Sequence, residues 1–285
     1  MSENKITLKN GMQMPRLGMG TWMLGEHNTI YQQELKALRA GMDAGFTLID
    51  TAEMYGNGLS EQLIGEAIQG YDREKLFLVS KVYPYNAGRP AIYDSIDQTL
   101  RNLKTDYLDM YLLHWRGSIP LEETVDSMEE LVKKGKIRSW GVSNLDTVDM
   151  EELFAIPKGD NCQVDQVLYH LGSRGVEYDL MPWLEEHNTA LMAYCPLAQA
   201  GSLRRELLKN PAVQKVARER GITEMQVLLG FVLHKQNVIA IPRSGRKEHV
   251  LQNWEMQEIQ LTEEEYCLLD QVFPAPKRKT YLDIV

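Results

Sequence analysis

The chain has 285 residues, 44% of them hydrophobic, which suits an α/β domain with a substantial core and argues against a disordered protein. Its formal net charge is -9 and it has no long basic tract, so nucleic acid is a poor candidate for a partner. Three scattered cysteines, with no apolar signal core and no stretch of bilayer length, predict a cytoplasmic protein without a zinc site or membrane partner.

In chain order, the predicted elements begin with a hairpin and then alternate between strands and helices. The segment ITLKNGMQM (6–14) predicts the hairpin, with its turn at Asn10-Gly11, and we expect it to close the floor of a barrel. Eight short β-branched or apolar runs then predict strands at 16–22, 46–52, 76–83, 107–115, 137–144, 162–169, 190–197 and 238–244.

Amphipathic patterns between these runs predict helices. The two clearest have apolar faces made of Ile92, Ile96, Leu100 and Leu103, and of Leu121, Val125, Met128 and Val132. The segments 248–256 and 262–272 predict two closing helices. Strands and helices that alternate in this way predict an α/β fold, a (β/α)8 TIM barrel with an N-terminal β-hairpin and extra C-terminal helices. We expect one domain over residues 1–285 and not an open doubly wound sheet.

Each predicted strand ends on a polar or aromatic residue. These residues are Thr21, Asp50, Lys81, His114, Asn144, Gln166, Tyr194 and Arg243. The carboxyl ends of the strands of a parallel barrel meet at one face, where barrel enzymes carry out their chemistry. One such residue is usually a cap or a turn former, but eight that converge, including an acid, an amine and an imidazole, favour an enzyme.

Four of the residues near this face predict chemistry on a carbonyl group. A lysine beside an aspartate stays charged, and a charged Lys81 beside Tyr55 lowers the pKa of a phenol from its usual value of about 10. His114 could donate a hydrogen bond to a substrate oxygen. The set has no reductant, and a nicotinamide hydride donor would complete it. Polar groups for the amide and phosphates and a flat partner for the ring are available at Ser143, Asn144, Gln166, Ser244 and Tyr194.

Other motifs of known chemistry are missing from the sequence. GMGTWM has Met23 where the third glycine of a dinucleotide fingerprint belongs, and there is neither a P-loop nor an H-E-x-x-H motif. We therefore expect no metal site.

The chain resembles the aldo-keto reductase family over essentially its whole length. The resemblance rests on GMGTW, LIDTAEMYGNG, LVSKVY, YLLHW, GVSN, QVLYH, AYCPLAQAG and IPRSGRKEHVLQN in that order, and indicates a bacterial reductase of the aldehyde, methylglyoxal or diketogluconate type. It implies a catalytic tetrad of Asp50, Tyr55, Lys81 and His114. In that tetrad the tyrosine is the general acid, the lysine lowers its pKa and the histidine orients the carbonyl.

The resemblance also implies an NADP(H) cofactor, with NAD(H) as a weaker alternative. The expected cofactor contacts are Gly20, Thr21, Trp22, Asp50, Ser143, Asn144, Gln166, Tyr194, Pro196, Leu197, Arg243, Ser244, His249, Gln252 and Asn253. Many members have a lysine, an arginine and a glutamate at the positions of Arg243, His249 and Gln252, where they hold the 2′-phosphate and the adenine. We nevertheless expect NADPH to be preferred, through Arg243 and Ser244.

The expected substrates are small aldehydes and ketones, including methylglyoxal-like dicarbonyls and aromatic aldehydes. The tail PAPKRKTYLDIV is short, whereas longer family members fold this segment over the substrate, so we expect an open mouth. Its expected walls are Trp22, Tyr83, His114 and Trp115. We expect the protein to be a monomer whose partner is a small carbonyl compound.

Two alternatives stay open at this stage. The protein could be a nonenzymatic redox sensor that binds a nicotinamide cofactor. It could also be a Schiff-base lyase through Lys81, although Asp50 and Tyr55 would keep that amine charged when a nucleophile must be neutral.

Overall fold

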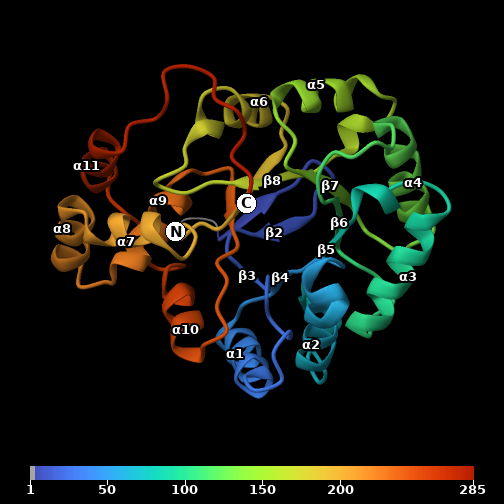
Figure 1. Cartoon of the computed structure of the whole chain (residues 1–285), viewed down its shortest axis with the longest axis horizontal. Coiled ribbons are helices and arrows are strands. Elements are labelled where there is room, and N and C mark those ends of the chain that lie inside the picture. Colours follow the sequence, from blue (N-terminus) through green and yellow to red (C-terminus); the bar gives the residue numbers. More distant parts are fainter. Residues whose placement is uncertain (1–3) are drawn as a thin grey trace.

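A computed structural model describes residues 4–285. The first three residues, which belong to the segment where no signal sequence was expected, lie outside the described residues. Eight parallel strands in the order β10-β9-β8-β7-β6-β5-β4-β3 form the centre of the molecule (Figure 1). They are β3 (Gly18–Gly20), β4 (Leu48–Asp50), β5 (Phe77–Val82), β6 (Met110–Leu113), β7 (Trp140–Ser143), β8 (Val164–Leu168), β9 (Ala190–Tyr194) and β10 (Val238–Ala240). The first and last strands of this order also meet, because Leu17 bridges Ala240 and Gly20 bridges Arg243 in parallel. The predicted (β/α)8 barrel is therefore confirmed.

The helices surround the strands (Figure 1). They are α1 (Tyr31–Ala44), α2 (Leu59–Ala67), α3 (Ala91–Leu103), α4 (Leu121–Lys133), α5 (Thr147–Ala155), α6 (Leu180–Glu186), α7 (Ser202–Lys209), α8 (Pro211–Arg220), α9 (Glu224–His234), α10 (Lys247–Glu255) and α11 (Glu263–Val272). The two predicted closing helices are α10 and α11. Within residues 4–285 no helix has both the length and the apolar character that a membrane crossing needs.

The apolar faces read from the sequence are the faces that the helices bury. In α3, Ile92, Ile96, Leu100 and Leu103 are all buried. In α4, Leu121, Val125 and Met128 are buried and Val132 is partly buried against the same core. These side chains belong to a large cluster of buried hydrophobic residues that fills the layer between the barrel and its helices. Burial of such apolar surface is the main favourable term in folding.

The N-terminal hairpin closes the barrel floor, as predicted. Strands β1 (Lys5–Thr7) and β2 (Gln13–Pro15) pair antiparallel. Gly11 takes the left-handed conformation that the turn requires, with φ of +84°. Leu8 and Met14 belong to a second buried cluster, together with strand residues that point into the barrel, such as Leu48 and Val79.

The segment that follows α11 crosses to the centre of the face seen in Figure 1, where the chain ends. The Ser173 hydroxyl donates to Asp283 Oδ2 at 2.5 Å. Burial raises the pKa of Tyr194, at the carboxyl end of β9, and the nearby backbone of Val285 lowers it part of the way back. The last residues of this tail thus lie near the end of a barrel strand, and the open mouth expected from a short tail stays a prediction.

Candidate active site

The centre of the candidate site is the ammonium group of Lys81. Its Nζ donates to Asp50 Oδ2 at 2.8 Å, to the Thr51 carbonyl at 2.7 Å and to Tyr55 Oη at 3.1 Å. The Lys81 side chain is 0% exposed and that of Asp50 is 2% exposed. One buried cation thus connects the carboxylate to the phenol, and all three of its donors are used.

Neighbouring strands bring these residues together. Asp50 is the last residue of β4 and pairs in register with Val79 of β5. Lys81 is two residues further along β5, so its side chain points to the same side of the sheet as that of Val79. Tyr55 opens the short 3-10 helix η1 (Tyr55–Gly58), in which Gly56 and Asn57 have φ near +56° and +57°. A Cβ at Gly56 would lie 2.7 Å from Glu26 Cγ, so glycine is needed both for its conformation and for space.

The eight residues predicted at strand ends belong to neighbouring strands of the barrel, but not all of them are the last residue of a strand. Lys81 lies inside β5 and Gln166 inside β8, because both strands continue for one or two residues. Arg243 lies three residues beyond the end of β10. Thr21, His114 and Asn144 directly follow their strands, whereas Asp50 and Tyr194 are terminal strand residues.

Burial changes the protonation of this site. It raises the pKa of the Tyr55 phenol above its usual value, and the adjacent Lys81 charge lowers it only part of the way back. The expected net lowering of the Tyr55 pKa is therefore wrong, since the desolvation of a buried phenolate raises this pKa by more than one cation lowers it. Burial lowers the pKa of Lys81, but Asp50 and Tyr55 outweigh it, and the net shift is upward. Lys81 is charged and Tyr55 protonated at neutral pH.

His114 lies on the other side of Tyr55, with their ring centroids 5.9 Å apart. Burial, together with the Lys81 charge, lowers the pKa of His114 to about 2. The imidazole is therefore neutral and carries one N–H. Its buried Nδ1 has no hydrogen-bond partner within residues 4–285. A neutral imidazole at this place can donate one hydrogen bond to a ligand without giving up its proton.

The residues expected to hold the nicotinamide amide form one network beside the tetrad. Gln166 Nε2 donates to Asp50 Oδ1 at 2.8 Å. Asn144 Nδ2 donates to the Ser143 hydroxyl at 3.2 Å, and the Tyr194 hydroxyl donates to Asn144 Oδ1 at 2.9 Å. Asn144 has a φ of 59°, a left-handed conformation that asparagine tolerates better than most residues. The structure thus brings together every residue predicted for this end of the cofactor.

The loop after β9 contains Pro196 and Leu197 between two strained residues. Cys195 has a φ of 49° and Ala198 a φ of 57°. The Ala198 amide donates to the Cys195 carbonyl at 2.9 Å, which closes a turn around Pro196 and Leu197. Arg204 Nε donates to the Leu197 carbonyl at 3.0 Å, and this hydrogen bond stabilises the loop. Sequence reading missed Arg204, because it lies beyond the matched piece AYCPLAQAG.

Two strands from β9 around the barrel opening, Gly20 and Thr21 lie against neighbouring backbone. A Cβ at Gly20 would be 2.7 Å from the Ile241 carbonyl oxygen, so any larger residue would push β3 away from β10. The Thr21 hydroxyl donates to the Asp50 carbonyl at 2.9 Å. Both residues therefore have structural contacts at the position where the cofactor was expected.

Arg243, expected at the 2′-phosphate, is bound to the chain itself. Its Nε donates to the Trp22 carbonyl at 3.0 Å and its Nη2 to the Met23 carbonyl at 3.1 Å. The Ser244 hydroxyl accepts from the Arg246 amide at 3.1 Å, just before α10 begins at Lys247 as predicted. His249 is exposed, Gln252 is partly buried and Asn253 is buried. Arg243 thus fastens the loop that contains Trp22, a role that the sequence did not indicate.

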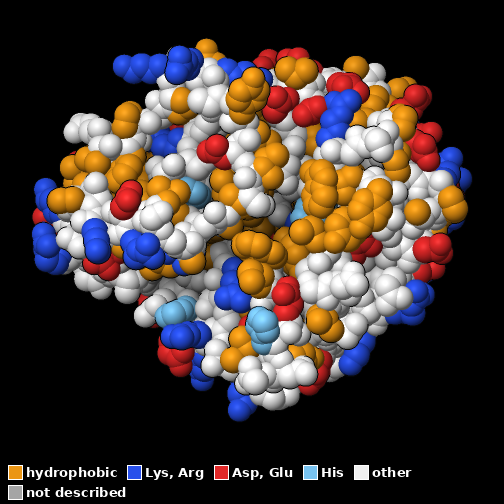
Figure 2. All heavy atoms as spheres, in the orientation of Figure 1, with side chains coloured by type: hydrophobic (Ala, Val, Ile, Leu, Met, Phe, Trp, Pro, Cys, Tyr) orange, Lys and Arg blue, Asp and Glu red, His pale blue; other side chains and the backbone are white. Residues whose placement is uncertain are grey.

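The expected substrate walls lie at the rim of the site. Trp22 is 43% exposed, and the rings of Trp115 and Tyr83 meet edge to face at 5.9 Å. The Tyr83 amide donates to Glu53 Oε1 at 2.6 Å. Glu53 was missed, although it lies between Asp50 and Tyr55 in the sequence. Figure 2 shows hydrophobic side chains gathered along one side of a hollow near the centre of this face.

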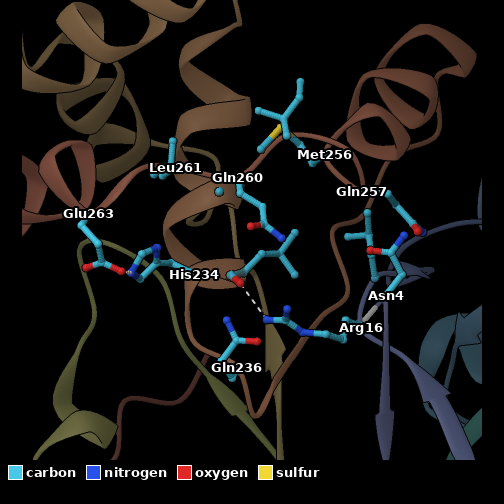
Figure 3. Close-up of a pocket in the computed structure, with 13 residues that line it drawn as sticks. Asn4, Arg16, His234, Gln236, Met256, Gln257, Gln260, Leu261 and Glu263 are labelled. Atoms are coloured by element: carbon cyan, nitrogen blue, oxygen red, sulfur yellow. Dashed lines mark hydrogen bonds and ion pairs between the residues drawn. The ribbon is translucent and has the colours of Figure 1, made fainter. Parts of the chain in front are cut away.

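A cavity of about 170 Å³ lies elsewhere, between α9, the start of β3 and the α10–α11 connection (Figure 3). Arg16 and Leu17 line it at the amino end of β3, away from Thr21 and the catalytic face. The Arg16 guanidinium donates to the Leu233 carbonyl at 2.6 Å and so caps the end of α9. None of the tetrad residues lines this cavity. Within residues 4–285, no group of three or more His, Cys, Asp or Glu side chains could hold a metal ion.

The barrel topology and the buried Asp50–Lys81–Tyr55 group agree with the family resemblance read from the sequence. The model of the aldo/keto reductase family matches residues 16–273, and the chain belongs to that family.

Several relatives are similar over their whole length. The methylglyoxal reductase YeaE of Escherichia coli (strain K12) is 52% identical over 285 residues, which is 100% of each chain. The glyoxal reductase of Bacillus subtilis (strain 168) is 30% identical over 94% of this chain and 92% of its own. The structure is also similar to the crystal structure of an aldo/keto reductase from Klebsiella pneumoniae in complex with NADP and acetate. That match has a TM-score of 0.96 and 52% identity, and it covers 99% of this chain and 100% of the other.

Proposed function

We propose that this protein uses NADPH to reduce small aldehydes, ketones and dicarbonyl compounds, such as methylglyoxal, to alcohols. The observation that carries the proposal is the Lys81 ammonium group, which joins Asp50 and the Tyr55 hydroxyl in a buried site. The proposal is supported by relatives named methylglyoxal reductase and glyoxal reductase. It is also supported by a 52% identical Klebsiella pneumoniae aldo-keto reductase crystallised in complex with NADPH.

In this mechanism Tyr55 is the proton donor. NADPH supplies the hydride when it is bound. The Tyr55 hydroxyl, held protonated by burial, donates its proton to the carbonyl oxygen as charge develops there. Lys81 lies 3.1 Å from that hydroxyl and stabilises the phenolate that forms. Asp50 holds Lys81 charged and in place.

His114 has a separate role, to orient the substrate. Because its ring is neutral, it can donate a hydrogen bond to the carbonyl oxygen and still not compete with Tyr55 as the acid. The edge-to-face contact of the two rings at 5.9 Å suits two donors that converge on one oxygen.

The cofactor would lie from Tyr194 to the start of α10. Ser143, Asn144 and Gln166 have the amide and hydroxyl groups that a carboxamide needs, and their present bonds would be exchanged for bonds to the ligand. The Tyr194 ring offers a stacking surface. The strained loop of Pro196 and Leu197 suits the phosphates, and the residues from Arg243 to Asn253 suit the adenosine end.

The Schiff-base lyase is not favoured. Asp50 and Tyr55 keep the Lys81 amine protonated, whereas a nucleophilic lysine must be neutral. A redox sensor without turnover is not favoured either, because the buried tetrad has the groups that proton transfer needs. Three expectations stay predictions beside this proposal: a monomer, a single domain over residues 1–285 and a cytoplasmic location.

A panel of carbonyl compounds tests the proposal directly. We expect NADPH consumption with methylglyoxal, glyoxal and aromatic aldehydes, because the rim formed by Trp22, Tyr83 and Trp115 is aromatic. The measurement is the steady-state decrease of NADPH absorbance with each compound. High efficiency for one sugar or steroid, without activity on simple aldehydes, would contradict the expected breadth.

We expect Arg243→Ala to weaken NADPH binding about ten- to hundredfold, since a hydrogen bond to a charged group contributes roughly 1.5–3 kcal/mol. NADH lacks the 2′-phosphate and should be much less affected. The measurement is fluorescence titration of both cofactors against the wild type and the variant.

Arg218→Ala is the matched control, because it removes an exposed positive charge on α8, outside the residues assigned to the cofactor. Arg243 also holds the Trp22 and Met23 carbonyls, so its loss should raise the aldehyde KM with either cofactor. Equal weakening of NADPH and NADH would show that Arg243 acts only on the fold, and the 2′-phosphate would then be bound elsewhere.

A further inference from the structure

The proton donor lies on a turn that leaves the barrel sheet directly after Asp50. Strand β4 pairs with β5 as far as Asp50 and Val79, and the chain then turns to reach Tyr55 five residues later. Strand β5 continues to Val82. At this end of β5, β4 no longer runs beside it, and the backbone groups that face this side need other hydrogen-bond partners.

Glu53 supplies these partners with both its backbone and its half-buried side chain. Its backbone amide donates to the Lys81 carbonyl at 3.3 Å. Its carboxylate oxygen Oε1 accepts from the Tyr83 amide at 2.6 Å and from Asn86 Nδ2 at 3.3 Å. Glu53 is therefore bonded to the residue before Val82 and to the residue after it, where β4 would otherwise continue.

These hydrogen bonds connect the two groups between which the proton donor is stabilised. Glu53 is bonded to the carbonyl of Lys81 and lies two residues before Tyr55 in the chain. The turn between Glu53 and Tyr55 is tight, because the Tyr55 amide donates to the Ala52 carbonyl at 3.0 Å. A shift of Glu53 would therefore move the Tyr55 hydroxyl relative to Lys81 Nζ, which lies 3.1 Å from it.

We propose that Glu53 is a positioning residue that holds the Tyr55 hydroxyl at the distance from Lys81 that proton transfer needs. The inference rests on the proposed reductase function and deepens it, because Glu53 acts through Tyr55. Its contact depends on reach and on one acceptor atom: Oε1 forms both hydrogen bonds, and Oε2 forms none within residues 4–285. The amide nitrogen of a glutamine can take the place of Oε2. An aspartate is one methylene shorter and cannot reach the Tyr83 amide unless the turn moves.

The test compares the wild type with Glu53→Gln, Glu53→Asp and Glu53→Ala in a single turnover of methylglyoxal, with NADPH bound and the aldehyde saturating. Glu53→Asp and Glu53→Ala should lower this rate about 10- to 100-fold, because a misplacement of about 1 Å can have an effect of this size. Glu53→Gln should stay within about threefold of the wild type, since it keeps the length and the acceptor. The Kd of NADPH should change by less than about twofold in all three variants, because substitutions away from a binding site have small effects.

Glu123→Ala is the matched control, because Glu123 Oε1 also accepts from a backbone amide, that of Arg89, at 3.0 Å. This contact lies outside the catalytic turn, and its loss should change the rate by less than about twofold. Nearly wild-type rates in Glu53→Asp and Glu53→Ala would overturn the proposal. A rate in Glu53→Gln as low as in Glu53→Asp would overturn it as well, since the charge of Glu53 and not its reach would then be what matters.

Hydrogen exchange tests the positioning without turnover and also detects a variant that is merely unstable. The amides of residues 53–58 should exchange faster in Glu53→Asp than in Glu53→Gln, while those of α3 and α4 exchange at the wild-type rate. Unchanged exchange of the turn in Glu53→Asp would overturn the proposal, and so would faster exchange throughout the molecule, which indicates a general loss of stability. A wild-type protein that reduces no aldehyde would contradict only the reductase function.

Discussion

Tyr55→Phe is expected to lower the rate of aldehyde reduction about 100- to 10,000-fold, the usual contribution of a general acid. NADPH binding should be unchanged, since the phenol is the only group removed and the ring stays against His114. The rate is measured in a single turnover with the cofactor already bound, and binding is measured by fluorescence titration.

Tyr178→Phe is a matched control for this variant, because it removes the same hydroxyl from an exposed ring outside the catalytic group. A deuterated NADPH shows whether hydride transfer limits the rate. If Tyr55→Phe turned over at nearly the wild-type rate while that isotope effect was fully expressed, another group would have to be the proton donor.

Lys81→Met is expected to reduce activity by a similar factor and also to destabilise the fold. Without the ammonium group, the phenolate of Tyr55 is no longer stabilised, and its pKa rises further above the usual value. The Asp50 carboxyl, 2% exposed, loses its cation and keeps the Gln166 amide. Removal of one partner from a buried ion pair typically costs about 3–5 kcal/mol in the free energy of unfolding. The measurements are kcat/KM and denaturant unfolding.

The double variant Asp50→Asn/Lys81→Met separates the two effects. It removes the unpaired carboxyl, so the free energy of unfolding should recover by several kcal/mol relative to Lys81→Met, whereas activity should not recover. Recovery of activity in the double variant would mean that Lys81 acts mainly by neutralising Asp50, and that its contact with Tyr55 is not needed for catalysis.

Much of the barrel could be predicted because its signals are local. A strand such as Phe77–Val82 begins with an apolar run, Phe77 to Val79, and α3 buries the stripe that its 3.6-residue period marks. The Asn10-Gly11 dipeptide predicts the hairpin, because both residues tolerate the positive φ angles that a tight hairpin turn requires. Adjacency then follows from topology, since successive strands of a parallel barrel are neighbours, and so Asp50 and Lys81 were expected to meet. The order of strands and the residues at their carboxyl ends thus predict that Asp50, Lys81 and His114 share one face, while the resemblance to the family implied their grouping with Tyr55 as a tetrad.

The errors concern quantities that depend on the whole fold. The pKa of Tyr55 is the result of burial working against one cation, and burial by distant segments is not a property of the turn that contains the tyrosine. For Arg243 the 2′-phosphate contact stays a prediction, but the sequence did not indicate that its side chain donates to carbonyls 220 and 221 residues away in the chain. Such a contact has no sequence period, because it forms only when the first and last strands of the barrel meet.

The sequence by itself determined the strand and helix pattern, the barrel topology and the identity of the groups that can transfer a proton, because each follows from local periodicity and the order of elements. Only the tertiary structure decided which of those groups are charged, which are already bonded to the chain and which surfaces stay open. The stacking of Tyr85 on Tyr83 at 4.7 Å and the position of Val285 near Tyr194 belong to this second kind. The physical reason is that solvent exclusion, hydrogen-bond partners and ring packing are set by segments that are distant in the chain and become neighbours only when the barrel closes.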